Sequence, residues 1–317
     1  MFGLTFLSAT SKTTTHRVVP FRMGRLLSGV AGYVAGGADS GNISGIIKVA
    51  FPDDTLTTLS ATLTTARASA TGFANSSVAG YHAGGYDGSN ISAIIKVAFP
   101  ADTLTTLSAT LTTARIRMAG FANSGVAGYA AGGSDGSNIS AIIKVAFPAD
   151  TLTTLSATLT TARVAAAGFA NSGVAGYAAG GSDSGNISGI DKVTFPADTK
   201  TTLSATLTTA RGFGTGFANS GVAGYHAGGY DSGNISGIDK VTFPADTKTT
   251  LSATLSTARE VPAGFANVGM AGYVAGGSPA TTAIDKIAFP ADTRTTLSAT
   301  LTTARGSAAG FANSGTL

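Results

Sequence analysis

The unit GFANSSVAGYHAGGYDGSNISAIIKVAFPADTLTTLSATLTTARIRMA, residues 72–119, is repeated along almost the whole chain. Its opening Gly-Phe pair returns every 48 residues, and once more after 46 because the sixth copy has lost two residues near Pro279. The phenylalanines of these pairs are Phe73, Phe121, Phe169, Phe217, Phe265 and Phe311. An earlier, blurred copy begins at Gly24 and becomes clear from Ser28. A fixed period indicates a repeat architecture more directly than chain length does.

Composition limits the classes of protein to which the chain can belong. Charged residues make up 11% and hydrophobic residues 43% of the 317 residues, which favours an ordered core over disorder. The chain has no cysteine, which excludes disulfides, zinc–thiolate sites and thiol nucleophiles. No apolar run approaches the length of a membrane span, so we expect no membrane insertion. The first residues lack the basic region of a secretory signal.

Within a unit, apolar residues alternate with a period of two and are interrupted by turn residues, which predicts strands rather than helices. The expected strands are GFANS, VAGYHAGG, ISAIIKVAF and LTTLSATL, joined by a tight turn, the YDGSN loop and the PADT turn. Four short antiparallel strands in each of six units predict an all-β fold, a six-bladed β-propeller.

Three features of each unit resemble the Kelch repeat. Gly84-Gly85 closes the second strand after Tyr81, an aspartate–glycine loop follows, and Arg115 ends the unit. The double glycine, the tyrosine and the terminal arginine recur in all six copies over residues 28–317. The tryptophan that the family carries near the start of the fourth strand is absent, so we expect lighter packing between blades. The resemblance implies a Kelch-like propeller, and the competing folds are a trimeric fibre and a β-solenoid.

The end of the chain repeats only the first strand of a unit. After Arg305 the sequence continues GSAAGFANSGTL, whereas the corresponding segment at the start has decayed to residues 24–28. We therefore expect residues 310–315 to supply the innermost strand of blade one and close the ring, which removes exposed strand edges. The chain then divides into a propeller, residues 28–317, and an N-terminal arm, residues 1–27.

The predicted arm is basic. It carries Lys12, Arg17, Arg22 and Arg25, and no acidic residue precedes Asp39. From Leu26 onward, sixteen basic and sixteen acidic residues cancel. The arm is predicted to anchor the chain to an acidic protein surface. A frayed terminus is the alternative, and a nucleic acid is the partner that we expect least.

Four polar positions are the same in all six units. We interpret the charged positions as structural pairing or capping residues, with a polyanion-binding ring of charges as the alternative. The asparagines are expected on the innermost strands around a central channel, where they make ordinary hydrogen bonds, with binding of water or an ion as the alternative. The positions are Lys48, Lys96, Lys144, Lys192, Lys240 and Lys286; Arg67, Arg115, Arg163, Arg211, Arg259 and Arg305; Asp54, Asp102, Asp150, Asp198, Asp246 and Asp292; and Asn75, Asn123, Asn171, Asn219, Asn267 and Asn313.

The four residues after each arginine vary most between units. These windows are residues 68–71, 116–119, 164–167, 212–215, 260–263 and 306–309. Recognition residues usually lie on loops of a rigid scaffold, and the Kelch resemblance places this connection on the ligand-binding face, together with the loop after the double glycine. The candidate contacts are Arg117, Met118, Phe213 and Glu260. Drift in a tolerant loop is the alternative.

A second difference marks blades two and five, which lie opposite each other in a ring of six. Only these blades carry a histidine in the second strand and a tyrosine after the double glycine, namely His82 with Tyr86 and His226 with Tyr230. Aromatic and imidazole groups beside Asp87 and Asp231 suit sugar stacking and hydroxyl bonding, so these four residues are candidate ligand contacts. Recent copying of one blade explains the pattern equally.

A third difference separates two halves of the ring. Blades one to three have Ile47, Ile95 and Ile143 with Leu56, Leu104 and Leu152, where blades four to six have Asp191, Asp239 and Asp285 with Lys200, Lys248 and Arg294. Hairpin spacing puts each pair in cross-strand or diagonal contact on one sheet face. Because burial of three charge pairs is costly, we expect this face to be exposed or half covered. The apolar residues would form a docking patch for another protein, and Ile95→Asp with Leu104→Lys should abolish docking.

Signatures of catalysis are missing. The three histidines, at 16, 82 and 226, are too dispersed for a metal triad. No sialidase box, Gly-x-Ser-x-Gly motif or phosphate-binding loop occurs. The Asp-rich loops after the double glycines read as solvated turns, with weak calcium binding as the alternative. We expect no enzymatic activity, no metal and no cofactor.

Uniform Gly-Tyr-x-x-Gly-Gly units with Ser- and Thr-rich fourth strands look like those of virion-associated proteins of bacteriophages. The resemblance implies a non-enzymatic virion component, a capsid decoration or fibre-associated protein assembled in the host cytoplasm. Its arm would contact other virion proteins or further copies of the chain, and its loops would bind a host glycan or protein. The alternative is a cellular Kelch-type adaptor that binds a peptide through the same loop face. Fold alone does not decide between them.

Overall fold

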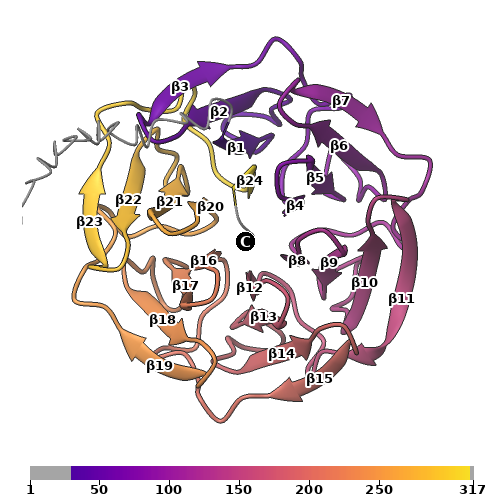
Figure 1. Ribbon diagram of the computed structural model, residues 1–317, viewed down its shortest axis with the longest axis vertical. Helices are drawn as coiled ribbons and strands as arrows, with labels where there is room; N and C mark the ends of the chain where they lie inside the picture. The colour runs from indigo at the N-terminus through magenta and orange to yellow at the C-terminus, as the bar shows by residue number, and fades with distance from the viewer. Residues whose placement is uncertain (1–29, 315–317) are drawn as a thin grey trace, which may run out of the picture.

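The structure, a computed structural model, describes residues 30–314. They form six four-stranded antiparallel sheets arranged as blades around a central axis (Figure 1). The predicted all-β, six-bladed propeller is therefore confirmed. The predicted arm of residues 1–27, with Lys12, Arg17, Arg22 and Arg25, lies outside the described residues.

Each blade has an innermost, a second, a third and an outermost strand. The innermost strands are β24 (Ala309–Ala312), β4 (Thr71–Asn75), β8 (Ala119–Asn123), β12 (Ala167–Asn171), β16 (Thr215–Asn219) and β20 (Ala263–Asn267) for blades one to six. The second strands are β1 (Ala31–Ala35), β5 (Ala79–Ala83), β9 (Ala127–Ala131), β13 (Ala175–Ala179), β17 (Ala223–Ala227) and β21 (Ala271–Ala275). The third strands are β2 (Ile46–Ala50), β6 (Ile94–Ala98), β10 (Ala141–Ala146), β14 (Ile190–Thr194), β18 (Ile238–Thr242) and β22 (Ile284–Ala288). The outermost strands are β3 (Thr55–Thr58), β7 (Thr103–Thr106), β11 (Thr151–Thr158), β15 (Thr199–Thr202), β19 (Thr247–Thr250) and β23 (Thr293–Thr296).

The last strand of the chain closes the ring. β24 pairs with β1 in antiparallel register, with Phe311 opposite Tyr33 and Ala309 opposite Ala35. Figure 1 shows the C-terminal strand β24 beside the N-terminal strand β1. Blade one is thus built from both ends of the described chain, as the sequence predicted, and has four strands like the other five blades.

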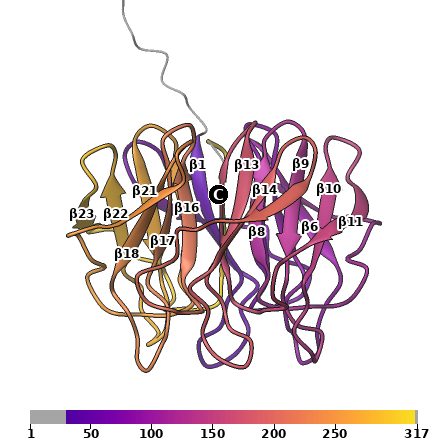
Figure 2. The same ribbon diagram turned by 90° about the horizontal axis from the view of Figure 1, so that it is seen from below.

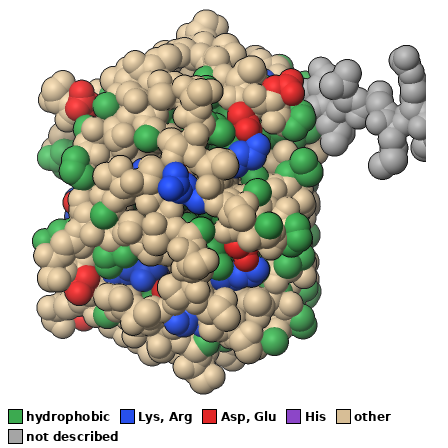
Figure 3. All heavy atoms as spheres, turned by 90° about the vertical axis from the view of Figure 1, so that its left-hand side faces the viewer, with side chains coloured by type: hydrophobic (Ala, Val, Ile, Leu, Met, Phe, Trp, Pro, Cys, Tyr) green, Lys and Arg blue, Asp and Glu red, His purple; other side chains and the backbone are tan. Residues whose placement is uncertain are grey.

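The outermost strands are shorter than the pattern predicted. Most contain four residues, and only β11 extends over the eight residues Thr151–Thr158, with a register shift against β10. In blade two the chain beyond β7 still follows β6, because Leu107 N donates to Ile94 O (2.9 Å) and Leu111 N donates to Ser92 O (2.9 Å). The side of the propeller that Figure 3 shows consists mostly of uncharged side chains and backbone, with scattered charges.

Aromatic rings fill the space between blades. Phe73 of β4 stacks on Tyr81 of the same blade at 5.2 Å, and Tyr81 stacks on Phe147 from the turn of blade three at 5.0 Å. Equivalent stacks occur at all six interfaces. Phe73 also covers Gly128 of blade three, where a Cβ atom would lie 2.0 Å from its ring. The glycine before each tyrosine is therefore required by the ring of the preceding blade.

The innermost strands approach each other closely around the axis. A Cβ atom on Gly72 would lie 2.1 Å from Gly310 O, and one on Gly120 would lie 2.1 Å from Gly72 O. Any side chain at this position would push the blades apart. The Gly-Phe pair that reveals the repeat thus has two uses, since the glycine permits close approach and the phenylalanine fills the interface.

Candidate functional site

The loops of the propeller gather on two opposite faces, which the side view in Figure 2 shows at the two ends of the strands. The window face carries the six variable windows and the loops after the double glycines, which are joined by bridges such as Ala68 with Tyr86 and Ile116 with Ser134. The turn face carries the turn after each innermost strand and the Phe-Pro turn, which are joined by bonds such as Phe99 N to Val78 O (2.8 Å). The window and the double-glycine loop therefore share one face, as the Kelch resemblance implied.

The second residues of the six windows form a closed collar on the window face. Each amide donates to the carbonyl of the preceding collar residue at 2.6–2.9 Å, so six hydrogen bonds run head to tail around the axis. The collar residues are Ser69, Arg117, Ala165, Phe213, Val261 and Ser307, and their φ angles lie between 49° and 62°. A residue other than glycine costs about 1–2 kcal/mol in this left-handed region. Six such residues around the axis hold the windows in a fixed, strained conformation.

The collar surrounds an opening on the axis. A cavity of about 110 Å³ is lined by residues of all six windows and by the glycines of the innermost strands. A second, wider hollow of about 400 Å³ extends from the opening over the windows of blades three, five, six and one and the loops of blades six and one. Arg117, Phe213 and Glu260 line this hollow. Three of the four predicted window contacts are thus brought together, although they come from blades three, five and six.

Met118, the fourth predicted contact, is placed differently. It is only 5% exposed and packs into the core cluster between blades two and three. A Cβ atom on Gly84 would lie 2.8 Å from its terminal methyl group. Its long, flexible side chain fills an interblade gap, so the prediction that Met118 is an accessible contact is wrong.

Arg117 is the distinctive residue of the opening. Its side chain is exposed, and its Cζ lies 5.1 Å from the centroid of the Phe213 ring. Among residues 30–314, every other lysine or arginine that is not buried forms an ion pair with a carboxylate. No such pair involves Arg117 and another described residue. The guanidinium is therefore held in place by an aromatic ring and keeps its hydrogen-bond donors free of a carboxylate.

The predicted histidine–tyrosine pairs are split by the structure. Tyr86 and Tyr230 are 44% and 39% exposed on the window face. His82 and His226 are completely buried, and desolvation, assisted by the neighbouring Arg67 and Arg211 charges, lowers the pKa of each to about 3. They are neutral core residues without access to a ligand, so their prediction as ligand contacts is wrong. Blade five makes room for its histidine with Gly214, where a Cβ atom would lie 2.2 Å from His226 Cε1.

The predicted docking patch is not a surface. Ile47, Ile95 and Ile143 have no exposed area, and Leu56, Leu104 and Leu152 pack partly buried against the same interblade clusters. In blades four to six the aspartates at this position are also buried, within 0–1% exposure, and pair with buried arginines. The predicted diagonal contact does occur, with Lys200 Nζ 3.8 Å from Asp191 Oδ1. The prediction overlooked that hydrogen bonds from threonine and serine residues compensate the burial of these aspartates.

Exposed apolar side chains occur instead on the turn face. Five units place one at the turn after the innermost strand, with 45–56% of it exposed. They are Val78, Val126, Val174, Val222 and Met270, and the partly exposed Val30 takes the same place in blade one. The neighbouring prolines and alanines of the Phe-Pro turns, such as Pro100 and Ala101, are exposed as well. We call Val30, Val78, Val126, Val174, Val222 and Met270 the apolar ring.

The aspartates of the Phe-Pro turns are neutralised by the preceding blade. Asp102 Oδ2 accepts from Lys48 Nζ (2.6 Å), and its Oδ1 accepts from Tyr33 Oη (2.7 Å). The same arrangement recurs at all six interfaces. Lysine and aspartate are therefore pairing residues, as predicted, and each lysine also lies 5.6–5.7 Å from a tyrosine ring.

The asparagines of the innermost strands also join neighbouring blades. Asn75 Oδ1 accepts from Gly125 N (2.9 Å) and Asn123 Oδ1 accepts from Gly173 N (2.9 Å), and Asn171 and Asn219 act in the same way. This confirms ordinary hydrogen bonding for these four residues. Within residues 30–314, no group of three or more His, Asp or Glu side chains is placed to hold a metal ion. Over the same residues no helix has the length and apolarity needed to cross a membrane.

Sequence reasoning found the windows but not the collar. The collar positions hold six residues of five types, none of them glycine or asparagine, so nothing in the sequence signals their left-handed conformation. A comparison with models of known protein families finds no match, and a comparison with curated protein sequences finds no significant relative.

Proposed function

We propose that the protein is a non-enzymatic binding protein of a bacteriophage virion, a capsid decoration or fibre-associated component. It binds a host glycan or protein through the window face. One observation carries the proposal, namely that the six segments that vary between repeats converge on one opening of an otherwise nearly constant scaffold. Divergence concentrated in one rigid, strained set of loops is the pattern of a recognition surface.

Attachment to the particle would use the opposite face. The turn face presents the apolar ring, and the one aspartate that recurs in every Phe-Pro turn is paired with a lysine and accepts a hydrogen bond from a tyrosine. The basic N-terminal residues join the described chain at Val30, which belongs to this ring, and Phe51 N donates to Val30 O. An apolar face suits a partly apolar protein surface, and the basic residues that precede Val30 in the sequence suit an acidic one. The window face would then point outward.

Mass spectrometry of purified phage particles that encode the chain tests the virion assignment. The chain should co-purify with the particle in stoichiometric amounts, and Val78→Asp with Val126→Asp should release it. As a matched control, Thr105→Asp with Thr153→Asp places the same charges on exposed positions of the outermost strands. Absence of the chain from washed particles contradicts the assignment.

A binding survey tests the recognition role. The full chain is applied to arrays of glycans and of peptides, together with the variant Arg117→Ala, Phe213→Ala. Glycan binding that the double variant loses supports the proposal. Peptide binding with no glycan binding, lost in the same variant, favours instead the cellular Kelch-type adaptor.

A further inference from the structure

We propose that Arg117 binds the single carboxylate of an acidic sugar residue in the hollow beside the collar. The inference rests on the proposed function, because it names the ligand class of the same face. The guanidinium of Arg117 forms no ion pair with a carboxylate of the described residues. Arginine presents a planar fork of N–H donors that matches the two oxygens of a carboxylate.

Two features fix the position of this guanidinium. The backbone of Arg117 belongs to the collar, where its amide donates to Ser69 O (2.8 Å) and its carbonyl accepts from Ala165 N (2.8 Å). The side chain lies over the Phe213 ring at 5.1 Å. A cation–π contact at an exposed site contributes about 0.5–1 kcal/mol. Both contacts reduce the conformational entropy that the arginine would lose on binding a carboxylate.

The hollow next to Arg117 has the size of a ligand site. Its volume of about 400 Å³ lies within the range of about 300–1,000 Å³ that small-molecule sites have. Its lining comes from the windows of blades three, five, six and one and from the loops of blades six and one. Ser278 and Ser307 supply hydroxyl groups to this lining, and Ser69, Thr71 and Thr215 line the adjoining opening on the axis. Such groups suit a ligand that carries several hydroxyls of its own.

Two carboxylates limit the charge of the ligand. Asp39 and Glu260 line the same hollow, and neither forms an ion pair with Arg117. Both can accept hydrogen bonds from sugar hydroxyl or amide groups, whereas they repel a second negative charge. A polyphosphate or a nucleic acid is therefore disfavoured. A ligand with one carboxylate and several hydroxyls, such as a uronic or sialic acid residue, fits both observations.

The test measures binding of small probes to the full chain by saturation-transfer NMR and calorimetry. The probes are the methyl glycosides of glucuronic acid and N-acetylneuraminic acid, with methyl glucoside as the neutral match and N-acetylglutamate amide as a carboxylate without a sugar. At least one acidic glycoside should bind, the neutral sugar should bind at least about tenfold more weakly, and added salt should weaken binding. The peptide-like carboxylate should bind more weakly than the acidic sugar.

Variants locate the site. Arg117→Ala should lower the affinity at least about tenfold, a loss of about 1.4 kcal/mol. Arg117→Lys should recover part of it, because lysine keeps the charge and loses the fork. Arg294→Ala, which removes an exposed arginine from β23 on the rim, should change nothing. Equal binding of acidic and neutral sugars, no binding of either acidic glycoside, or full affinity in Arg117→Ala overturns the inference. If the chain still binds other glycans or proteins through the windows, the proposed function stands although the inference about Arg117 fails.

Discussion

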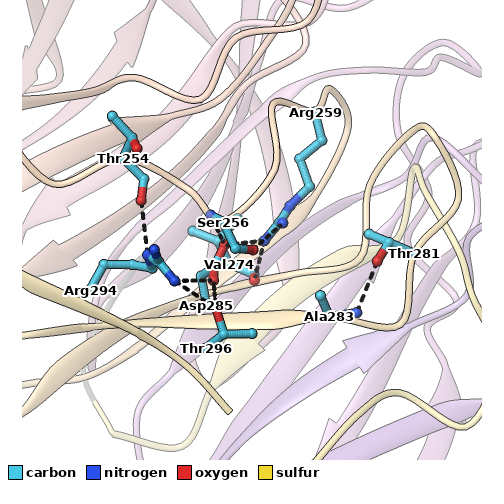
Figure 4. Close-up of polar contacts among 9 residues, drawn as sticks. All are labelled: Thr254, Ser256, Arg259, Val274, Thr281, Ala283, Asp285, Arg294 and Thr296. Atoms are coloured by element: carbon cyan, nitrogen blue, oxygen red, sulfur yellow. Dashed lines mark hydrogen bonds and ion pairs between the residues drawn. The ribbon is translucent and has the colours of Figure 1, made fainter. Parts of the chain in front are cut away.

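The interfaces that lead into blades one, two and three hold a buried arginine differently from those that lead into blades four, five and six. In the first set, Arg67 donates to the carbonyls of Gly84 (3.1 Å) and Ala93 (3.2 Å) and forms no ion pair with a carboxylate of residues 30–314. Arg115 and Arg305 donate to the equivalent carbonyls of blades three and one. In the second set, Arg163 pairs with Asp191 at 2.9 Å. Figure 4 shows the equivalent Arg259–Asp285 pair.

The difference shows that one scaffold accepts two arrangements. Asp191 accepts from Thr160 N and Oγ1 and from Thr202 Oγ1, in addition to Arg163. Burial tends to raise the pKa of Asp191, but these hydrogen bonds and the arginine charge together lower it below its ordinary value. In blade two, Ile95 occupies the aspartate position, and Thr64 and Thr106 repeat the threonines. The isoleucine-to-aspartate change between half-rings is thus an exchange within the core and does not mark a docking surface.

The largest expected effect comes from removal of the arginine itself. Arg163→Met removes the buried cation of Asp191 and leaves only the partly exposed Lys200 at 3.8 Å, which should cost about 3–5 kcal/mol of unfolding free energy. Arg115→Met leaves only two carbonyls without a donor, which should cost about 1–3 kcal/mol. Chemical denaturation followed by circular dichroism measures both. Equal losses for the two variants would contradict the distinction between the interfaces.

A conversion of one interface into the other should be tolerated. Ile95→Ala removes buried methyl groups and should cost about 2–5 kcal/mol. Ile95→Asp with Leu104→Lys rebuilds the pair found in blade five, where Asp239 also lies opposite a histidine, and should change stability by less than about 1.5 kcal/mol. If the double variant is as unstable as Ile95→Ala in the same denaturation experiment, the two interface arrangements are not interchangeable.

The scaffold was predictable because its rules are local and repeated. A period of 48 residues, alternation within each unit and a final unpaired first strand together determine blade number, strand order and closure. The site was only partly predictable. The windows were identified by their variation, but the contact between Arg117 and Phe213 joins residues 96 positions apart, and only the closed ring brings them together.

Burial was the quantity that sequence reasoning misjudged. His82, Met118 and Ile95 were predicted as accessible because their positions vary between units. All three are buried in the folded chain. Gly214 is the informative case, since it is the only glycine at its window position and lies directly against His226. Paired changes of this kind signal packing and not ligand contact.

The two buried histidines allow a pH comparison between the half-rings. Their pKa is about 3 in the folded chain, against about 6.5 unfolded. The unfolded state therefore binds more protons below pH 6.5, and stability should fall as pH decreases, by up to about 1.4 kcal/mol per pH unit for each histidine. Denaturation between pH 6.5 and 4.5 measures the slope.

Blades three and four carry alanine at the histidine position. The variants His82→Ala and His226→Ala should therefore each reduce the slope of unfolding free energy against pH by the contribution of the histidine removed. A slope that the double variant retains in full would show that other groups cause it. His226 has Asp239 as a neighbour and His82 has no acid there, so a smaller contribution from His226 would sharpen the comparison.

The smallest effect, and no difference between half-rings, is expected for the lysines of the turn face. Lys96–Asp150 and Lys240–Asp292 have the same geometry, with side chains that remain 15–23% exposed. Lys96→Ala and Lys240→Ala should each cost about 1 kcal/mol, and the loss should shrink at high salt. A clear difference between the two variants would mean that the half-rings differ beyond the arginine interfaces.

The most direct measurement concerns the collar. Ala165 already occupies one collar position, so Ser69→Ala, Arg117→Ala, Phe213→Ala, Val261→Ala and Ser307→Ala together give an all-alanine collar on an unchanged backbone. Thermal unfolding and binding to an array of acidic and neutral glycans are measured for this chain and for the wild type. We predict an unfolding temperature within a few degrees of the wild type and loss of the binding that the wild type shows. Retained binding by a stably folded variant would contradict recognition through the window face.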